Sequence, residues 1–184
     1  FDDTFDTCYN ENLAGTDIRR KYRIRYYNDN TGYINLEKKS KLRGMTRKTS
    51  EKLSVEETMA YINGTNDLTK GALTTELFGY QIKSGMKPKC IVEYDRCAFV
   101  EDVGNVRITF DTNIRGSAEI DRFFDFDEDF MVPAMEAGYH VLEVKYDEFL
   151  PKYLREMVDL NDLHRQSVSK YAIVREAIAQ GGIY

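Results

Sequence analysis

The chain is poor in the residue types that build zinc sites and disulfide frameworks. Its 184 residues include three cysteines and two histidines. The cysteines are odd in number and lack metal-ligand spacing, and neither a CxxC nor an HExxH pattern occurs, which argues against a zinc site and a disulfide scaffold. No Ser-His or Cys-His arrangement suggests a covalent nucleophile. Free cysteines are typical of a reducing compartment, so we expect a cytoplasmic location.

Long apolar runs and an overall basic charge are also missing. No segment approaches the roughly 18 apolar residues of a membrane-spanning helix, and the start carries no signal-peptide pattern. The formal net charge is -5, whereas a simple nucleic-acid binder is normally basic. We therefore expect neither a membrane segment nor a nucleic-acid partner. A basic site would have to be a local concentration of cations.

The length of 184 residues and the hydrophobic share of 42% fit one domain with its own core. We expect a single domain over residues 1–184. The chain begins with Phe1 rather than Met, which suggests that an N-terminal piece of the natural protein is missing. We predict residues 1–18 as the end of a strand followed by an irregular polar stretch.

Residues 19–27 have the aromatic and β-branched content of a strand, in which alternate side chains take opposite faces. One face is basic and consists of Lys21, Arg23 and Arg25. The other face is apolar and consists of Tyr22, Ile24 and Tyr26. The apolar face can pack in a hydrophobic core. Core packing does not account for the three cations on the basic face.

A hairpin and two helices are predicted to follow. The turn-rich residues 28–32 lead to a second strand over residues 33–43, where Glu37, Lys39 and Lys41 lie on one face. We predict residues 44–53 as a polar connection, which adds Arg47 and Lys48. Helices are predicted over residues 54–62, after a capping box at Ser54, and over residues 68–83, before Gly85. These helices either brace a barrel or form the contact of a homodimer.

The second half of the chain repeats the charged strand faces. Strands are predicted over residues 90–99, 106–111 and 139–146, and helices from Pro151 and over residues 169–180. The charged or polar positions on these strands include Arg96, Arg107, Thr109, Asp111, Glu143 and Lys145. Between them, Phe123, Phe124 and Phe126 are predicted to pack on the outside of the sheet. The periodicity is compatible with a barrel and with a sandwich.

The cations require an anion if all these faces point into one closed barrel. Two like charges about 8 Å apart repel by roughly 2 kcal/mol at an effective dielectric constant of about 20. Several such pairs would exceed the typical stability of about 5–15 kcal/mol. Arginine forks and lysine point charges fit a chain of phosphates, and Glu37 and Glu143 could hold a divalent metal that bridges phosphate oxygens. If the faces point outward instead, they are ordinary solvated surfaces.

Six segments in series resemble the VTC domain, the polyphosphate polymerase domain of the vacuolar transporter chaperone type. They are KYRIRYYN (21–28), LEKKSK (36–41), EYDRCAF (93–99), VRITFDTNIR (106–115), VLEVKYDEFLPKYL (141–154) and SKY (169–171). The domain belongs to the CYTH, or triphosphate tunnel metalloenzyme, group. The resemblance implies an α+β fold with an antiparallel β-barrel tunnel braced by helices. It also implies that inward basic residues bind triphosphate or polyphosphate, with Mn²⁺ or Mg²⁺ as cofactor.

The resemblance also implies roles by position. Implied catalytic residues that contact phosphate are Arg23, Arg25, Lys39, Arg96, Arg107 and Lys145. Further phosphate-binding residues are Lys41, Lys48 and Lys170, and the metal ligands are Glu143 and Glu37. The family's first strand has no counterpart here, and FDDTFDT resembles the family's segment after that strand. The resemblance therefore leaves one expected lysine and one metal-side acid that cannot be assigned in this sequence.

The implied reaction transfers the γ-phosphoryl group of ATP to a growing polyphosphate chain. Water as the acceptor would instead make the protein a tripolyphosphatase, with Glu37 or Asp111 as the candidate general base. A third alternative is a non-catalytic polyphosphate-binding module. The carboxylates of Glu37 and Glu143 argue against that alternative, because acids in an anion site lower its affinity unless they hold a metal.

Overall fold

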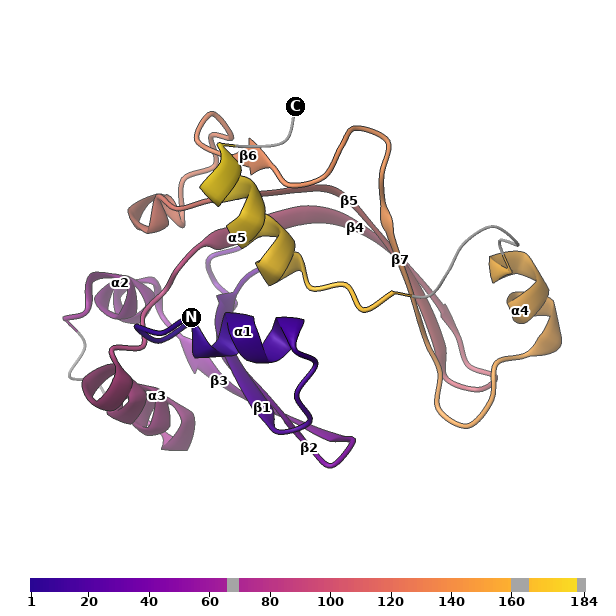
Figure 1. The fold of residues 1–184 in the computed structure, drawn as a ribbon, viewed down its shortest axis with the longest axis horizontal. Coiled ribbons are helices and arrows are strands. Elements are labelled where there is room, and N and C mark those ends of the chain that lie inside the picture. Colours follow the sequence, from indigo (N-terminus) through magenta and orange to yellow (C-terminus); the bar gives the residue numbers. More distant parts are fainter. Residues whose placement is uncertain (66–69, 160–165, 182–184) are drawn as a thin grey trace. The chain divides into compact units, whose positions relative to one another are not determined.

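The computed structural model describes residues 1–65, 70–159 and 166–181. Two compact units make up the chain. The first comprises Phe1–Ile91 and Ser117–Met131, and the second comprises Val92–Gly116 and Val132–Tyr184. Each unit has helices and an antiparallel sheet, so the predicted α+β class is confirmed (Figure 1). The single domain over residues 1–184 stays a prediction.

The first unit contains a three-stranded sheet in the order β1-β2-β3. Strand β1 spans Arg19–Arg25 and β2 spans Ile34–Leu42, which confirms the predicted hairpin. The prediction of a polar connection over residues 44–53 was wrong, because β3 spans Met45–Leu53 and pairs with β2 along its length. Most of β3 is exposed, and a strand with polar side chains on both faces has no hydrophobic alternation to reveal it.

The β2–β3 turn is equally hard to recognise from the sequence. Its two central residues, Arg43 and Gly44, both have positive φ, at 50° and 79°. Positive φ at both positions is the geometry of a type I′ hairpin turn, which usually carries Asn-Gly or Asp-Gly. Because Arg43 stands where Asn or Asp is usual, the sequence does not show the typical turn pattern.

A short helix, α1 (Thr7–Leu13), occupies the segment that was predicted as irregular. The buried carboxylate of Asp2 accepts hydrogen bonds from the Cys8 and Tyr9 backbone N–H groups, at 2.8 and 2.9 Å. These N–H groups lie in the first turn and have no partner within the helix. A side chain five residues before the helix thus satisfies them. In Figure 1, α1 lies beside β1.

Two predicted helices brace the first sheet. Helix α2 spans Val55–Asn63 and begins with the predicted capping box at Ser54. Helix α3 spans Ala72–Ser84 and ends at Gly85, whose φ is 65°. The predicted start of this helix at Leu68 lies outside the described residues. The core of the unit consists of Cys8, Tyr22, Ile34, Leu36, Leu53, Tyr61, Leu73, Leu77 and Met86. Both helices therefore pack on the first sheet, whereas bracing of a barrel and the homodimer contact both stay predictions.

The 3₁₀ helix η1 (Ile120–Arg122) contacts α2 in the same unit. After it, Phe123 and Phe124 pack against Tyr26, with ring centroids 5.2 and 5.5 Å away. Tyr26 belongs to the apolar side of the first strand, so the packing predicted for these two phenylalanines is confirmed. Phe126 is 56% exposed, and the prediction was wrong for that residue.

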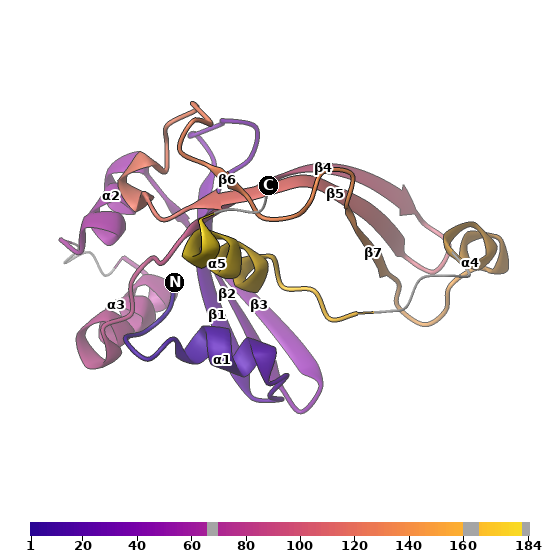
Figure 2. The same ribbon diagram turned by 45° about the horizontal axis from the view of Figure 1, so that its top comes forward.

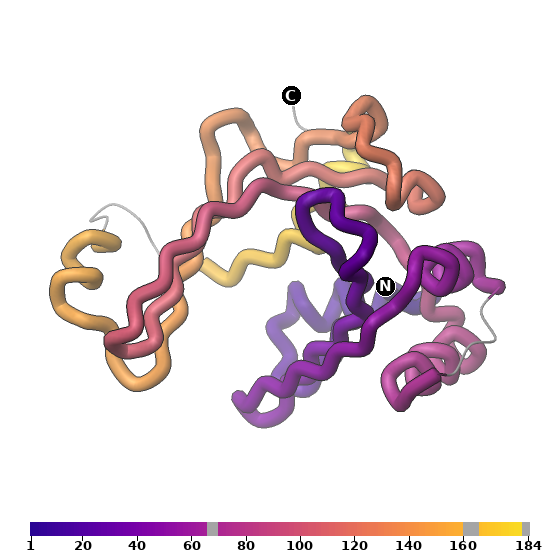
Figure 3. The backbone as a smooth tube through the Cα atoms, turned by 180° about the vertical axis from the view of Figure 1, so that it is seen from behind, coloured from indigo at the N-terminus to yellow at the C-terminus, as the bar shows by residue number. Residues whose placement is uncertain are grey.

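The second unit contains a four-stranded sheet. Strand β4 spans Ile91–Glu101 and β5 spans Val106–Ser117, and together they form one long hairpin (Figures 2 and 3). On its other edge β5 pairs with β6 (Val132–Pro133) and with β7 (Val141–Lys145). The strands predicted over residues 90–99, 106–111 and 139–146 are thus present with shifted ends.

The second unit also contains helices α4 (Lys152–Val158) and α5 (Lys170–Gln180), as the sequence predicts. Ser169 caps α5 by accepting from the Ala172 backbone N–H at 3.4 Å. No closed barrel occurs among the described residues, whose strands form two open sheets. The tunnel stays a prediction. The described helices are too short or too polar to cross a membrane.

Candidate phosphate-binding faces

Strand pairing gathers the cations of the first sheet on one face. Paired residues of neighbouring antiparallel strands point to the same side, and alternate residues along each strand do so too. This face, named the first polar face, consists of Arg19, Lys21, Arg23, Arg25, Asn35, Glu37, Lys39, Lys41, Thr46, Lys48, Ser50 and Lys52. Eight of these twelve side chains are cationic and one is acidic.

Core packing fixes which side chains form this face. On the opposite side of the sheet, Tyr22, Leu36 and Leu53 are buried in the core of the first unit. A shift of the pairing by one residue would expose these side chains and bury the cations, so the register is strongly specified. The hydrophobic core thereby holds eight cations on the other face, where they play no part in the core.

Glu37 is the acid of the first polar face, and it contacts both arginines predicted from the sequence. Its Oε2 atom accepts from Nε and Nη2 of Arg23 at 2.8 and 2.7 Å, and its Oε1 atom accepts from Nη2 of Arg25 at 2.5 Å. Burial raises the pKa of Glu37, but the hydrogen bonds and charges of Arg23 and Arg25 lower it further, so the net shift is downward. Glu37 therefore stays ionised and holds the two guanidinium groups in place.

Three lysines form a cross-strand row beside that cluster. Lys39 pairs with Lys21 on one side and with Lys48 on the other. Burial lowers the pKa of Lys21, and the nearby charges of Arg19 and Lys39 lower it further. Lys21 also donates to the Asn12 side chain of α1. Like charges directly opposite each other destabilise a sheet, so the three lysines do not contribute to the stability of the folded sheet by their charges.

A buried carboxylate organises the second unit in the same way. Asp111 is 0% exposed, and its two oxygens accept from Nε and Nη2 of Arg96 at 2.5 and 2.7 Å. Lys170, the first residue of α5, lies 2.5 Å from Asp111 Oδ2. The Tyr94 ring lies 5.1 Å from the Arg96 guanidinium and 4.9 Å from Lys170 Nζ. Burial raises the pKa of Asp111, and its bonds to Arg96 and Lys170 bring the net shift downward.

Register places the remaining predicted residues on the same side of the second sheet. Arg107 pairs with Lys145, and Thr109 pairs with Glu143. Lys145 Nζ lies 2.9 Å from Glu143 Oε2. The second polar face consists of Arg96, Arg107, Thr109, Asp111, Glu143 and Lys145. The alternation predicted for Arg107, Thr109 and Asp111 is thus present.

All the site residues predicted from the sequence occur on or beside these two faces. The first unit contributes Arg23, Arg25, Glu37, Lys39, Lys41 and Lys48, and the second contributes Arg96, Arg107, Glu143, Lys145 and Lys170. Sequence reasoning missed Lys52, because β3 was not recognised. Because β3 carries polar residues on both faces, no alternation in the sequence marks Lys52.

The two acids predicted as metal ligands have different surroundings. Both oxygens of Glu37 are occupied by arginines. Glu143 is 41% exposed and pairs in register with Thr109, whose buried Oγ1 has no hydrogen-bond partner among the described residues. A carboxylate and a hydroxyl are the hard oxygen ligands that Mg²⁺ and Mn²⁺ accept, usually beside substrate phosphates and water. By donor type Glu143 and Thr109 fit such an ion, although Lys145 already contacts one of the two Glu143 oxygens and no group of three potential ligands occurs in the described residues.

The family model of the VTC domain matches residues 1–178, which is nearly the whole chain. No curated protein matches the chain.

Proposed function

Because the chain belongs to the VTC domain family, whose function is related to polyphosphate, we propose that it is a polyphosphate polymerase. It would transfer the γ-phosphoryl group of ATP to the end of a growing polyphosphate chain. The observation that carries this proposal is the first polar face, where eight cations surround one acid. A linear polyanion is a ligand that matches such a surface in charge and extent.

The proposed chemistry depends on positioning and on charge stabilisation. Phosphoryl transfer requires little covalent work from the protein, because the transition state spreads negative charge over the transferred group. Arg23, Arg25 and Lys39 would contact non-bridging oxygens in the first unit. Arg96, Arg107 and Lys145 would do so in the second, with Lys41, Lys48 and Lys170 as further phosphate contacts. These predicted roles are all compatible with the positions of the side chains.

The state of the acids favours a polymerase over a hydrolase. Hydrolysis benefits from a general base that activates water, and Glu37 and Asp111 are the candidates. Both carboxylates accept hydrogen bonds from two cations, and both have lowered pKa values. A carboxylate in that state is a weak base. The terminal phosphate of a polyphosphate chain is already an anionic nucleophile and needs no base, so transfer to phosphate suits this site better.

A divalent cation, Mn²⁺ or Mg²⁺, is the proposed cofactor, with Glu143 and Thr109 as its protein ligands. When bound, such an ion neutralises charge on the phosphate oxygens that it contacts. Glu37 is the less suitable of the two predicted acids, because Arg23 and Arg25 already occupy its oxygens. Its proposed role is instead to orient those arginines toward the polyanion.

Incubation of the protein with ATP and Mn²⁺, followed by gel electrophoresis of the products, tests the proposal. Long chains that disappear in the Arg23→Ala variant support the polymerase. Release of orthophosphate from tripolyphosphate without chain growth would identify a hydrolase. Tight binding of polyphosphate without turnover would identify a binding module, and either of these last two results would overturn the proposal.

A further inference from the structure

The second unit has an open cavity at the ends of β5 and β7. Its volume is about 560 Å³, which falls in the range of about 300–1,000 Å³ that is usual for small-molecule sites. The lining residues are Asn105, Arg107, Val144, Lys145, Tyr146 and Asp147. Two of them, Arg107 and Lys145, belong to the second polar face, and the others have no role in the proposed chemistry.

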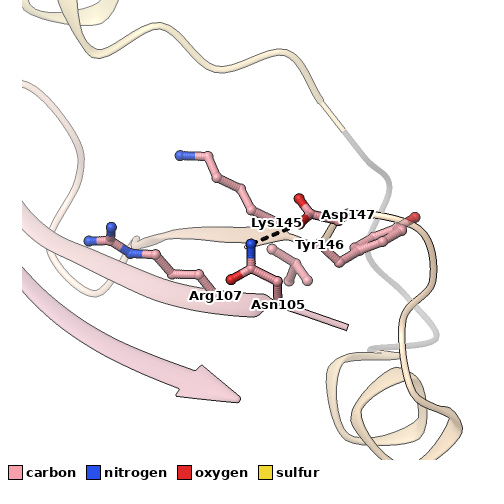
Figure 4. Close-up of a pocket in the computed structure, with 6 residues that line it drawn as sticks. Asn105, Arg107, Lys145, Tyr146 and Asp147 are labelled. Carbon is pink, nitrogen blue, oxygen red and sulfur yellow. Dashed lines mark hydrogen bonds between the residues drawn. The ribbon is translucent and has the colours of Figure 1, made fainter. Parts of the chain in front are cut away.

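The side chains that line the cavity differ in chemical type from one end of the cavity to the other. Figure 4 shows Arg107 and Lys145 extending to one side and the Tyr146 ring extending to the other. Between them, Asn105 Nδ2 donates to Asp147 Oδ2 at 2.8 Å. The cavity therefore presents two cations at one end, an amide and a carboxylate in the middle, and an aromatic ring at the other end.

A nucleoside triphosphate has the same order of groups. Its phosphates match the cations, its ribose hydroxyls match a carboxylate acceptor, and its base matches an aromatic ring on which it can stack. The Tyr146 side chain is available for such a contact, because the residue is 40% exposed. The hydrogen bond from Asn105 uses one of the roughly four acceptor positions of the Asp147 carboxylate, which leaves others for a hydroxyl group.

We infer that this cavity binds the nucleoside of the ATP donor, with Tyr146 against the base and Asp147 as acceptor for a ribose hydroxyl. Arg107 and Lys145 then contact the triphosphate. The inference rests on the proposed function and deepens it. It assigns a binding site to the nucleoside, which ATP has and polyphosphate lacks. The cavity would thereby distinguish the donor from the growing chain.

Calorimetric binding of two ligands tests the inference. A non-hydrolysable ATP analogue and tripolyphosphate share the phosphate contacts, but only the analogue has a nucleoside. Tyr146→Ala should weaken binding of the analogue about tenfold, as expected for one lost stacking contact, and leave tripolyphosphate binding unchanged. Tyr146→Phe keeps the ring and should restore the wild-type affinity. Tyr139→Ala, which removes a 63% exposed tyrosine of the same unit outside the cavity, is the matched control and should change neither affinity.

Equal effects of Tyr146→Ala on both ligands, or no effect on either, would overturn the nucleoside site. The proposed function would survive that outcome, provided that the wild-type protein still makes polyphosphate from ATP. A wild-type protein that binds neither ligand would overturn the proposed function together with the nucleoside site.

Discussion

Arg96 and Asp111 form a paired, two-point contact between β4 and β5. Two guanidinium nitrogens of Arg96 donate to the two carboxylate oxygens of Asp111, at 2.5 and 2.7 Å. Lys170 of α5 reaches the same carboxylate. One buried acid thus joins three elements and orients two cations that are predicted to contact phosphate.

Asp111→Asn should lower the free energy of unfolding by about 2–3 kcal/mol. Removal of one partner from a fully buried ion pair costs about 3–5 kcal/mol, and we expect less here because Arg96 and Lys170 remain partly exposed. Urea unfolding measures the change. The control is Asp95→Asn on β4, which alters an exposed side chain that accepts from Asn113 and should cost under about 1 kcal/mol. Equal stabilities of the two variants would contradict the anchoring role.

The stabilising effect of Glu37 should depend on pH. The pKa of Glu37 in the folded protein lies below its ordinary value of 4.5, so its contribution is present above that value and is lost as the pH falls through the lowered pKa. The difference in unfolding free energy between wild type and Glu37→Gln should therefore be constant above pH 4.5 and shrink in more acidic solution. Unfolding curves at a series of pH values measure it. A difference that grows on acidification would contradict the ion pairs.

Two adjacent cations of β3 allow a matched test of where polyphosphate binds. Lys48 lies on the first polar face, and Arg47 pairs with Ser40 on the opposite face. Both are exposed cations, so each substitution by alanine changes the net charge equally. Lys48→Ala should weaken polyphosphate binding several-fold and reduce its dependence on salt, because one phosphate contact is lost. Arg47→Ala should stay within about twofold of wild type. Equal losses would show that net charge, rather than this face, determines binding.

Glu143 and Glu37 can be separated as metal ligands. Glu143→Gln should weaken Mn²⁺ binding in the presence of tripolyphosphate by at least about tenfold, since loss of even a supporting group in a metal site costs that much. Glu37→Gln should leave Mn²⁺ affinity nearly unchanged, because its oxygens contact Arg23 and Arg25. Titration calorimetry with Mn²⁺ provides the readout without turnover. If Glu37→Gln weakened Mn²⁺ binding more than Glu143→Gln does, Glu37 on the first sheet would be the metal ligand instead.

Elements with an apolar periodicity or a strong cap were predictable from the sequence. The β1–β2 hairpin, the capping box of α2 and the glycine that ends α3 are examples. Strand β3 and helix α1 were missed for physical reasons. Strand β3 has polar residues on both faces, and α1 depends on the Asp2 carboxylate, which lies outside the helix.

The charged strand faces were predictable, and the contacts within them were not. Alternation along a strand tells which of its own side chains share a face. It does not give the register between strands, which decides that Lys39 lies between two lysines and that Thr109 lies beside Glu143. The contact of Lys170 with Asp111 joins residues far apart in the sequence, so no local pattern could indicate it.

The fate of the γ-phosphoryl group of ATP is the most direct test of the proposed polymerase. ADP, orthophosphate and chain-bound phosphate should be quantified together in a single reaction with ATP and Mn²⁺. A polymerase releases one ADP for each phosphate added to a chain and leaves almost no orthophosphate, and Arg23→Ala should abolish both products. Release of ADP and orthophosphate in equal amounts, without chain growth, would contradict the proposal.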